Sequence, residues 1–527
     1  MLARRSPPAR TTPAADNRLL NRSPTVRLPS STPNMPSSTA GLTDAILALA
    51  FIGDLSMGRS TDHSRRTACL AGWLAQACGA DLDAQNHARA TALLRWSGCT
   101  ANASGFAELL GDDVAAREAM MAQTLPPLTA QTQSLIVPLA LIHCEVSGDV
   151  AATMGMAPRV VDALRNIFER FDGKGMPAGH DADAIPETVF FVNVASDLEI
   201  LSRAHGRENA LAFLRSQSDA KYPARLVDIA CLHAGRWLDA LDADVADDAL
   251  IASERDTRTW RLAQTGSHAD VPLALLADVT ELKLPWLAGF SRRTADLASR
   301  TAQSLALDAD MQTQLHAAAL LHGIGRAALP NRLWETDGKL SADQWEKVRL
   351  VPYWSARAAK QVEGLRHAAD LASYAYERLD GSGYFRGVAG SALTTPQRIL
   401  AASVAFEALL AARPWRQAHT FDEAVDIIER EAGAGKFDPE IVTAIVATAQ
   451  GQTVRARTAP SGASALLSPR ELDVLRQIST GLSNKEAARA LALSPSTVRT
   501  HVESIFRKLD CSTRAAATLK ALTAGML

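Results

Sequence analysis

The sequence predicts an all-α protein with three folded units. Small and apolar residues recur at the spacing of one helix face, as at Thr294, Leu297, Ala298 and Thr301, while alternating β-branched runs are nearly absent. Aromatic residues make up only 5% of the chain, which fits a helical core built from small side chains. The length of 527 residues is enough for about three domains at roughly 150 residues each.

An internal repeat organises the middle of the chain. Residues 63–94 align without gaps on residues 290–321, with 16 identities in 32 positions. The similarity resumes downstream, where Glu169-Arg-Phe-Asp-Gly matches Glu377-Arg-Leu-Asp-Gly. Self-similarity of this kind indicates a duplicated structural unit. We therefore predict two homologous helical domains, the first copy and the second copy, at residues 41–245 and 266–450.

Breaks in composition set the remaining boundaries. The first forty residues combine six Arg with many Pro, Ser and Thr and one acidic residue, a mixture that buries too little apolar surface to fold. We predict that residues 1–40 are disordered. Polar stretches predict linkers at residues 246–265 and 451–465, which leaves residues 466–527 as a separate C-terminal domain.

The overall composition excludes several classes of protein. A net charge of −2 argues against a chain that coats nucleic acid along its whole length. The six cysteines are scattered without a CxxC pair, which argues against disulfides and structural zinc and favours a reducing cytoplasm. The apolar run at residues 134–144 is too short to cross a bilayer and contains Pro138 and His143. We expect a cytoplasmic protein with no membrane segment, in which this run forms a buried helix.

Several motifs of the second copy carry a family resemblance. They are Leu321-His322-Gly-Ile-Gly325-Arg326, Glu377-Arg-Leu-Asp380-Gly381-Ser-Gly383-Tyr384, Arg413-Pro-Trp-Arg416 and Lys436-Phe-Asp438-Pro439. With these motifs the second copy resembles the HD-GYP domains of the HD phosphohydrolase superfamily. The resemblance implies a helical bundle and, as in most characterised members, hydrolysis of cyclic di-GMP at a centre of two or three metal ions.

Most of the metal ligands that this resemblance implies are missing. Only His322 and Glu377 remain in the second copy, and the other ligand positions hold Phe290, Gly323, Val351, Ala375, Tyr376 and a residue near Val404. The first copy keeps His63, but its His-Asp pair reads Arg95-Trp96 and its later pair reads Ile167-Phe168. One imidazole and one carboxylate do not hold a dinuclear centre. We therefore expect no catalytic residue, no metal at the vestigial positions His322 and Glu377, no cofactor and no enzymatic activity.

Alternatives remain open at these positions. His322 and His63 are either core histidines satisfied by a backbone carbonyl or metal ligands. The segments that begin at Asp172 and Asp380 are either tight turns or phosphate cradles made of backbone N–H groups. Without catalysis, the two copies would sense a nucleotide or small-molecule effector, pair protomers or position the C-terminal domain. One rival to the hypothesis of inactive copies is a metal-dependent phosphohydrolase with a DNA-binding tail. Another is a scaffold that recruits partner proteins.

The C-terminal domain carries helix start and stop signals at short, regular intervals. Ser468-Pro-Arg-Glu471 and Ser483-Asn-Lys-Glu486 are capping boxes that begin two helices, and Gly481 ends the first. Ser494-Pro495 caps a third helix, whose inward stripe is Val498, Val502, Ile505 and Leu509. Two short helices joined by a tight turn are the arrangement that places a recognition helix in the major groove of DNA.

Together with Ser496-Thr-Val-Arg-Thr-His501 and Lys508-Leu509, these motifs resemble the LuxR-type helix-turn-helix domain. The resemblance implies four helices, binding of double-stranded DNA and a role in transcriptional regulation. Charge agrees, because nine Lys or Arg stand against five acidic residues from Ser468 onward. The predicted architecture is thus two tandem HD-GYP-like domains followed by a four-helix LuxR-type domain.

The outward face of the third helix predicts the residues that contact DNA. Those expected to reach DNA are Ser496, Thr497, Arg499, Thr500 and Glu503, with Arg499 the best candidate for a base edge, and those suited to phosphates are Asn484, Lys485 and Lys508. The alternative for each is a solvated surface position. In the last helix, one face carries Ala516, Leu519 and Leu522. In this family that face pairs protomers, so we expect a homodimer, with packing inside one chain as the alternative.

Overall fold

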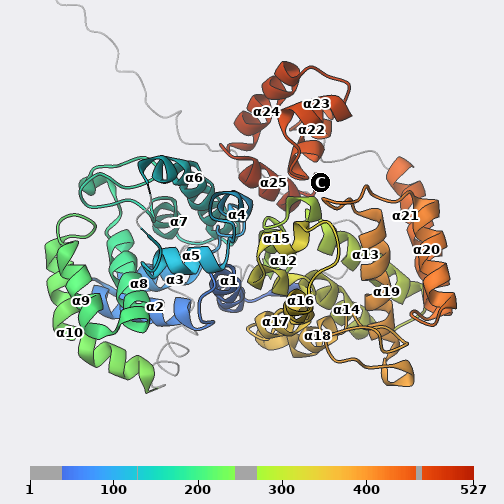
Figure 1. Ribbon diagram of the computed structural model, residues 1–527, viewed down its shortest axis with the longest axis horizontal. Helices are drawn as coiled ribbons and strands as arrows, with labels where there is room; N and C mark the ends of the chain where they lie inside the picture. Colours follow the sequence, from blue (N-terminus) through green and yellow to red (C-terminus); the bar gives the residue numbers. More distant parts are fainter. Residues whose placement is uncertain (1–37, 127–128, 244–269, 459–465) are drawn as a thin grey trace, which may run out of the picture. The chain divides into compact units, whose positions relative to one another are not determined.

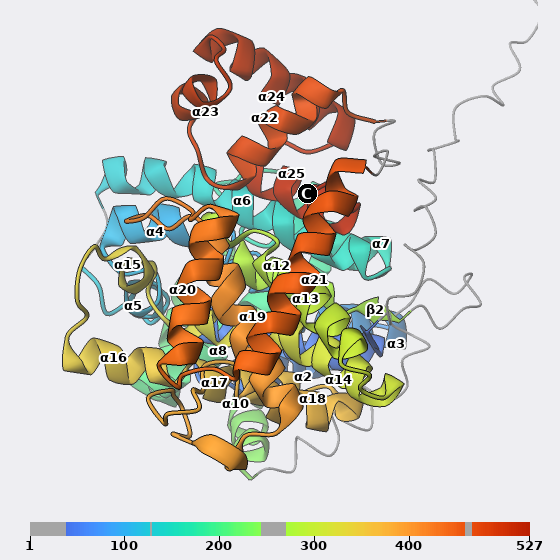
Figure 2. The same ribbon diagram turned by 90° about the vertical axis from the view of Figure 1, so that its right-hand side faces the viewer.

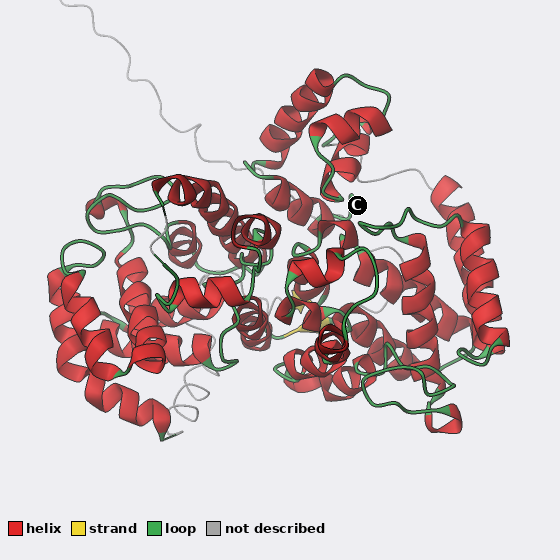
Figure 3. Cartoon of the chain, viewed as in Figure 1, coloured by secondary structure: helices red, strands yellow, loops and turns green. Residues whose placement is uncertain are grey.

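The computed structural model describes residues 38–126, 129–243, 270–458 and 466–527 (Figure 1). These residues form helices joined by loops, together with one pair of two-residue strands (Figure 3). The predicted all-α class is confirmed. Helices dominate because small residues that fit close helix packing, above all alanine, fill the buried positions.

The first copy begins with strand β1 (Thr39–Ala40). Its helices are α1 (Leu42–Ser56), α2 (His63–Ala77), α3 (Leu82–Leu94), α4 (Ala103–Leu110), α5 (Ala115–Met121), α6 (Ala130–Thr153), α7 (Pro158–Arg165), the 3-10 turn η1 (Ala182–Ala184), α8 (Glu187–His205), α9 (Arg207–Ser216) and α10 (Ala224–Asp242).

The second copy begins with strand β2 (Val271–Pro272). Its helices are α12 (Ala274–Glu281), η3 (Pro285–Leu287), α13 (Phe290–Ser304), α14 (Ala309–Leu321), η4 (Ile324–Ala328), α15 (Asn331–Glu335), α16 (Ala342–Arg349), α17 (Val351–Ala359), η5 (Glu363–Leu365), α18 (Arg366–Ala372), η6 (Gly390–Ala392), α19 (Thr395–Leu410), α20 (Phe421–Gly433) and α21 (Pro439–Thr458). Figure 2 shows α19, α20 and α21 side by side, in mutual contact.

The repeat found in the sequence is visible in the helices. Helix α2 aligns with α13, and α3 aligns with α14. Each helix begins and ends at the position that aligns with the first and last residue of its counterpart. The second helix of each pair is capped in the same way, because Asp81 accepts a hydrogen bond from the amide of Ala84 and Asp308 from that of Met311. The two domain boundaries themselves stay a prediction.

The ends of the copies differ from the sequence expectation in two places. Thr39 and Ala40 lie in the segment predicted to be disordered, yet they pair antiparallel with Pro272 and Val271. Composition missed this strand because its partner lies far away in the chain. Helix α21 continues to Thr458 and so covers the first part of the predicted linker 451–465, because residues 451–458 contain no proline to stop a helix. Residues 1–37 of the predicted disordered segment, the linker 246–265 and residues 459–465 lie outside the described residues.

Helix α6 contains the apolar run noted in the sequence and is longer than that run. Within the described part of the chain, its segment Thr132–Thr153 is the one helix long and apolar enough to meet the criteria for a membrane span, and half of its apolar window is buried in the protein. The length was underestimated because the helix continues past Pro138 and on through Glu145 and Asp149.

A buried ion pair joins the two copies. Lys283, which follows α12, and Asp113, in the loop before α5, are fully buried and form a salt bridge. Asn331 completes the pair, because its amide N–H donates to Asp113 at 2.7 Å and its side chain donates to the carbonyl of Lys283 at 2.9 Å. Buried charges are tolerated when they are paired and hydrogen-bonded in this way.

Removing one member of this pair should destabilise the protein strongly. Asp113→Ala leaves Lys283 buried without a counter-charge, so we expect a loss of about 3–5 kcal/mol of stability. Thermal unfolding of the full chain measures this as a lower melting temperature. The double variant Asp113→Ala with Lys283→Met should recover most of the loss, and equal melting of the single variant and the parent protein would contradict the prediction.

Candidate functional site

The C-terminal domain has the predicted helix-turn-helix form. Its helices are α22 (Pro469–Ser479), α23 (Asn484–Ala490), α24 (Pro495–Leu509) and α25 (Arg514–Thr523) (Figure 1). Both predicted capping boxes are present, at Ser468 with Glu471 and at Ser483 with Glu486. Ser494 caps α24 by accepting the amide of Thr497 at 3.0 Å. The local signals in the sequence therefore determine where these helices begin.

Helix α24 divides into a buried and an exposed face. The predicted inward stripe, Val498, Val502, Ile505 and Leu509, is buried in the core of this domain. The predicted DNA-contacting residues of the opposite face are exposed: Ser496, Thr497, Arg499, Thr500 and Glu503. Arg499 and Glu503 of this face also line a pocket together with Pro138, Leu141 and Ile142 of α6.

Arg499 forms an ion pair within α24. Its Nε lies 2.9 Å from Glu503 Oε1, and the two side chains are 75% and 64% exposed. An exposed pair of this kind contributes little to stability, so the guanidinium is free to exchange Glu503 for a base edge. The ion pair also aligns the side chain along the outer face of the helix.

Lys508 has a partner that the sequence analysis did not anticipate. Its Nζ lies 2.6 Å from Glu471 Oε2, and the other oxygen of this carboxylate accepts a hydrogen bond from Ser504 at 2.7 Å. Burial alone would raise the pKa of Glu471, but Lys508 and the hydrogen bonds of Ser468 and Ser504 lower it to about 2. Glu471 thus links α22 to α24, and Lys508 takes part in this link in the absence of DNA.

The two predicted phosphate contacts on α23 differ in their surroundings. Lys485 is exposed at the start of the helix. Asn484 is half-buried, and its side-chain oxygen accepts a hydrogen bond from Arg514 at 2.6 Å. Arg514 also donates to the carbonyl of Leu482 at 2.5 Å, so it connects α25 to the turn before α23.

The face of α25 that was expected to pair protomers is buried within the chain. Ala516, Leu519 and Leu522 are at most 2% exposed, and the helix contacts α22, α6 and α12. The alternative of packing inside one chain therefore describes this face. The homodimer stays a prediction, and a dimer interface would have to use another surface.

In the second copy, His322 is fully buried and surrounded by aromatic rings. Its Nδ1 lies 2.6 Å from the carbonyl of Ala319, the contact that the core-histidine interpretation predicts. Burial, and secondarily Arg326, lower its pKa to about 3, so the ring is neutral. The rings of Phe290 and Tyr376 lie 5.8 and 6.0 Å away, centre to centre.

The glutamates of the two repeated motifs satisfy backbone amides. Glu377 accepts the amides of Arg386 and Val388, and Glu169 accepts those of Ala178, Gly179 and His180. Each glutamate therefore fixes the loop that follows it, a role that the ligand-by-ligand comparison in the sequence did not reveal.

The Asp-Gly segments beside these glutamates are tight turns. Asp172 accepts the amide of Lys174 at 3.1 Å, and Asp380 accepts that of Ser382 at 2.9 Å. A Cβ atom at Gly175 or Gly383 would lie 2.4 Å from a backbone nitrogen. The turn interpretation accounts for both the aspartates and the glycines.

The described residues do not fit a dinuclear metal centre. None of their His, Cys, Asp and Glu side chains gather in a group of three or more that could hold a metal ion. His322 Nε2 has no hydrogen-bond partner, but Glu377 is occupied by backbone amides and the remaining neighbours, Phe290 and Tyr376, supply no matching ligands. We therefore assign no reaction step to a metal in this copy.

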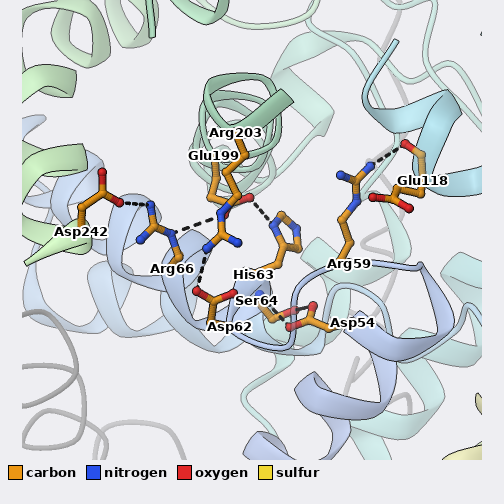
Figure 4. Close-up of polar contacts among 10 residues, drawn as sticks. All are labelled: Asp54, Arg59, Asp62, His63, Ser64, Arg66, Glu118, Glu199, Arg203 and Asp242. Carbon is orange, nitrogen blue, oxygen red and sulfur yellow. Dashed lines mark hydrogen bonds and ion pairs between the residues drawn. The ribbon is translucent and has the colours of Figure 1, made fainter. Parts of the chain in front are cut away.

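In the first copy, His63 lies in a charged network (Figure 4). Its Nδ1 is 2.5 Å from Glu199 Oε2, and Glu199 also pairs with Arg203 at 2.5 Å and with Arg66 at 3.4 Å. Burial would raise the pKa of Glu199, but these charges outweigh it and lower the pKa. The expected backbone carbonyl partner of His63 is thus replaced by a carboxylate 136 residues away.

A buried carboxylate is fixed in the same way in both copies. Asp54 accepts the amide and hydroxyl of Ser64 at 3.1 and 2.6 Å (Figure 4), and Glu281 accepts the amide of Ser291 at 2.7 Å. Burial raises the pKa of each carboxyl group to about 7. Each pair links the end of one helix to the start of the next, α1 to α2 and α12 to α13.

The first copy contains a cavity that its sequence did not predict. Arg95 and Trp96, noted only as replacements for a His-Asp pair, line a cavity of about 470 Å³ together with residues of α5 and α6. Arg95 is 2% exposed and its Nε and Nη1 have no hydrogen-bond partner. An arginine inside an apolar helical repeat was the available signal, since arginine is rarely buried without a partner.

Two segments of the chain match known protein families. Residues 274–441 match the HD domain family, and residues 465–521 match the luxR family of bacterial regulatory proteins. The chain thus carries an HD domain and a LuxR-type helix-turn-helix domain, as its motifs predicted. The HD match covers the second copy, and the assignment of the first copy to the same family stays a prediction.

Relatives of the long helical part are phosphodiesterases. The 3'3'-cGAMP-specific phosphodiesterase 3 of Vibrio cholerae serotype O1 is 24% identical over 452 residues, which cover 78% of this chain and 95% of that protein. The 3'3'-cGAMP-specific phosphodiesterase 1 of the same organism is 32% identical over 176 residues, 33% of this chain and 41% of that protein. The solved structure of a cyclic GMP-AMP specific phosphodiesterase of V. cholerae shares the fold, with a TM-score of 0.56 and 20% identity, covering 78% of this chain and 98% of that one.

The C-terminal domain has a different relative. The nitrate/nitrite response regulator protein homolog of Haemophilus influenzae is 51% identical over 53 residues, 10% of this chain and 26% of that protein. The chain therefore joins segments that resemble two separate groups of proteins.

The expectation that the chain is not an enzyme is wrong. Similarity to a phosphodiesterase extends over 78% of the chain, further phosphodiesterases match a third of it, and the second copy matches the HD domain family. The expectation rested on counting side chains at aligned ligand positions. Such a count tests one way of building a site and says nothing about groups recruited from other parts of the fold.

The raised pKa of Asp54 predicts a pH dependence of stability. The folded state holds its proton up to about pH 7 whereas the ordinary pKa of an aspartate is 3.8, so this residue's contribution to stability is fully present below pH 3.8 and is lost as the pH rises to about 7. Between pH 5 and pH 8 the parent protein should lose roughly 3 kcal/mol of stability through this group, at about 1.4 kcal/mol per pKa unit. The Asp54→Asn variant should not show this loss. Melting temperatures of parent and variant at both pH values measure it.

Asp242→Asn is the matched control, because that side chain is 69% exposed and its replacement should leave the pH dependence unchanged. If the melting temperature falls by the same amount between pH 5 and pH 8 in Asp54→Asn and in the parent protein, the buried carboxyl group of Asp54 is not the cause of the pH dependence.

Proposed function

We propose that this chain is a transcriptional regulator that binds a specific DNA sequence through α24. The observation that carries the proposal is the exposed polar face of Ser496, Arg499 and Thr500 on a helix whose opposite face is fixed in the domain core. A recognition helix of this kind reads base edges in the major groove, and arginine bound to guanine is its commonest specific contact.

Charges around α24 support the proposal. Lys485 and Arg507 are exposed, and the domain from Ser468 onward holds nine basic against five acidic residues. Because the chain as a whole carries a net charge of −2, attraction to phosphates is local to this end. The cytoplasm, where chromosomal DNA lies in bacteria, is the compartment that this function implies.

The DNA-binding proposal predicts a specific effect of Arg499. We expect Arg499→Ala to weaken binding by about 1–3 kcal/mol, roughly 5- to 150-fold, because a base contact is lost. The measurement is a fluorescence anisotropy titration against the duplex that the parent protein selects from a random-sequence library. The same titration against an unrelated duplex should change far less.

Arg476→Ala is the matched control, since it removes one exposed guanidinium from α22 in the same domain. Lys508→Met removes the ion pair between Lys508 and Glu471. It should therefore lower the melting temperature of the protein, and its effect on sequence preference should be small. An Arg499→Ala protein that binds and discriminates like the parent would exclude α24 as the reading helix.

A second function, hydrolysis of a phosphodiester bond in a cyclic dinucleotide, is favoured by the relatives. The observation behind it is the 24% identity to 3'3'-cGAMP-specific phosphodiesterase 3, which covers nearly the whole of that protein. The described residues do not show which groups would activate water, so this proposal concerns the substrate class and not the mechanism.

This second proposal predicts turnover by the purified full chain. We expect 3'3'-cGAMP to be converted to a linear product, measured by chromatography with and without added Mn²⁺. No turnover of 3'3'-cGAMP by the purified parent protein, with or without Mn²⁺, would refute the proposal.

A further inference from the structure

A cavity of about 470 Å³ lies in the first copy, at the place that corresponds to His322 in the second. Its walls come from the end of α3, from α5 and α6 and from the loop after α7. A volume of this size is in the range of pockets that enclose small organic molecules. It is distinct from the exposed face of α24 and from the surroundings of His322.

The polar part of the cavity wall is cationic. Arg95 is 2% exposed, its Nε and Nη1 have no hydrogen-bond partner, and its guanidinium carbon lies 4.3 Å from the centre of the Trp96 ring. Burial lowers the pKa of Arg95 to about 10, which leaves it charged at neutral pH. A buried guanidinium with unused donors is costly unless an anion meets it.

A second buried guanidinium shares this wall. Arg117 is 1% exposed and donates to the carbonyl of Cys99 and to the side-chain oxygen of Asn102, both at 2.8 Å. These hydrogen-bond partners are neutral, and the acidic group that acts on Arg117 from nearby, Asp113, is already paired with Lys283. The acidic residue of the wall, Glu169, already accepts three backbone amides. Lys174, exposed at the loop, adds a further positive charge.

The remainder of the wall is apolar and adaptable. It includes the rings of Trp96, Phe106 and Phe168 and the side chains of Met57, Met121 and Ile136. Aromatic faces and flexible thioethers accommodate hydrocarbon or aryl groups of varied shape. Inorganic phosphate alone would leave most of this surface uncovered.

We propose that the cavity is a binding site for a small organic anion with an apolar body, such as an aliphatic or aromatic carboxylate. Arg95 binds the anionic group through its unused N–H donors, and Trp96, Phe106 and Phe168 enclose the body. The site requires neither DNA binding nor phosphodiester hydrolysis, and it supplies this regulator with an input for a small-molecule effector.

Two fluorescent probes with the same aromatic body test the proposal. Anilinonaphthalene sulfonate carries an anionic group, and N-phenylnaphthylamine is its neutral counterpart. Both are titrated into the full chain, and decanoate and cyclic di-GMP are then added as competitors. We expect saturable binding of the sulfonate and its displacement by decanoate. Displacement by cyclic di-GMP but not by decanoate would overturn the assigned ligand class.

Arg95→Gln keeps a polar side chain and removes the charge. It should weaken binding of the sulfonate by about tenfold or more, as expected for a lost charged hydrogen bond, and leave binding of the neutral probe unchanged. Arg95→Lys should retain part of the affinity, because it keeps the charge without the planar donors. Arg413→Gln is the matched control, since it removes a largely buried guanidinium beside Trp286 in the second copy.

Melting temperatures separate a binding defect from misfolding. The ligand-free Arg95→Gln protein should melt no lower than the parent, because a buried charge whose Nε and Nη1 have no hydrogen-bond partner has been removed. Decanoate should raise the melting temperature of the parent and of Arg413→Gln but not that of Arg95→Gln. Equal affinity of parent and Arg95→Gln for the sulfonate, or a loss of both probes together, would overturn the proposal.

Discussion

The buried pair of Asp113 and Lys283 is the constraint on which the arrangement of the two copies depends. Both side chains are completely enclosed, so neither charge is tolerable without the other, and Asn331 donates one hydrogen bond to Asp113 and one to the backbone carbonyl of Lys283. The pair fixes the end of α12 against the start of α5. Helix α5 carries Arg117 into the cavity wall, and α12 leads to the Glu281–Ser291 contact that orients α13. One ion pair thereby positions the cationic cavity in the first copy and the first helices of the second.

The two copies share their framework and differ in their centres. The carboxylates of Asp54 and Glu281 bind the following helix alike, and Glu169 and Glu377 fix their loops alike. At the centre, Arg95 opens on a cavity, whereas His322 is packed among rings. Because framework contacts are satisfied within each copy, side chains at the centre could change without loss of the fold. This explains how one architecture holds an anion-binding cavity and a domain related to phosphodiesterases.

Local signals were sufficient to predict much of the C-terminal domain. Ser468, Ser483 and Ser494 cap helices through residues three positions away, a distance that a sequence shows directly. Contacts between distant residues were not predictable. Glu471 contacts Lys508, which is 37 residues away in the sequence, and His63 contacts Glu199, which is 136 residues away. Neither contact was predicted from the sequence. The enzymatic expectation failed for a related reason, because matching ligands position by position assumes that function follows the motif and not the whole fold.

Helix α6 physically connects the proposed input to the proposed output. Its first half contributes Ile136 and Ala140 to the cavity, and its second half holds the C-terminal domain, where Glu145 accepts the amide of Ser512 at 2.5 Å and Asp149 lies 3.4 Å from Lys520. An anion that shifts α6 therefore also shifts the surface on which α25 rests. Coupling of this kind is reciprocal, so any factor by which the anion alters DNA affinity is the factor by which DNA alters the affinity for the anion.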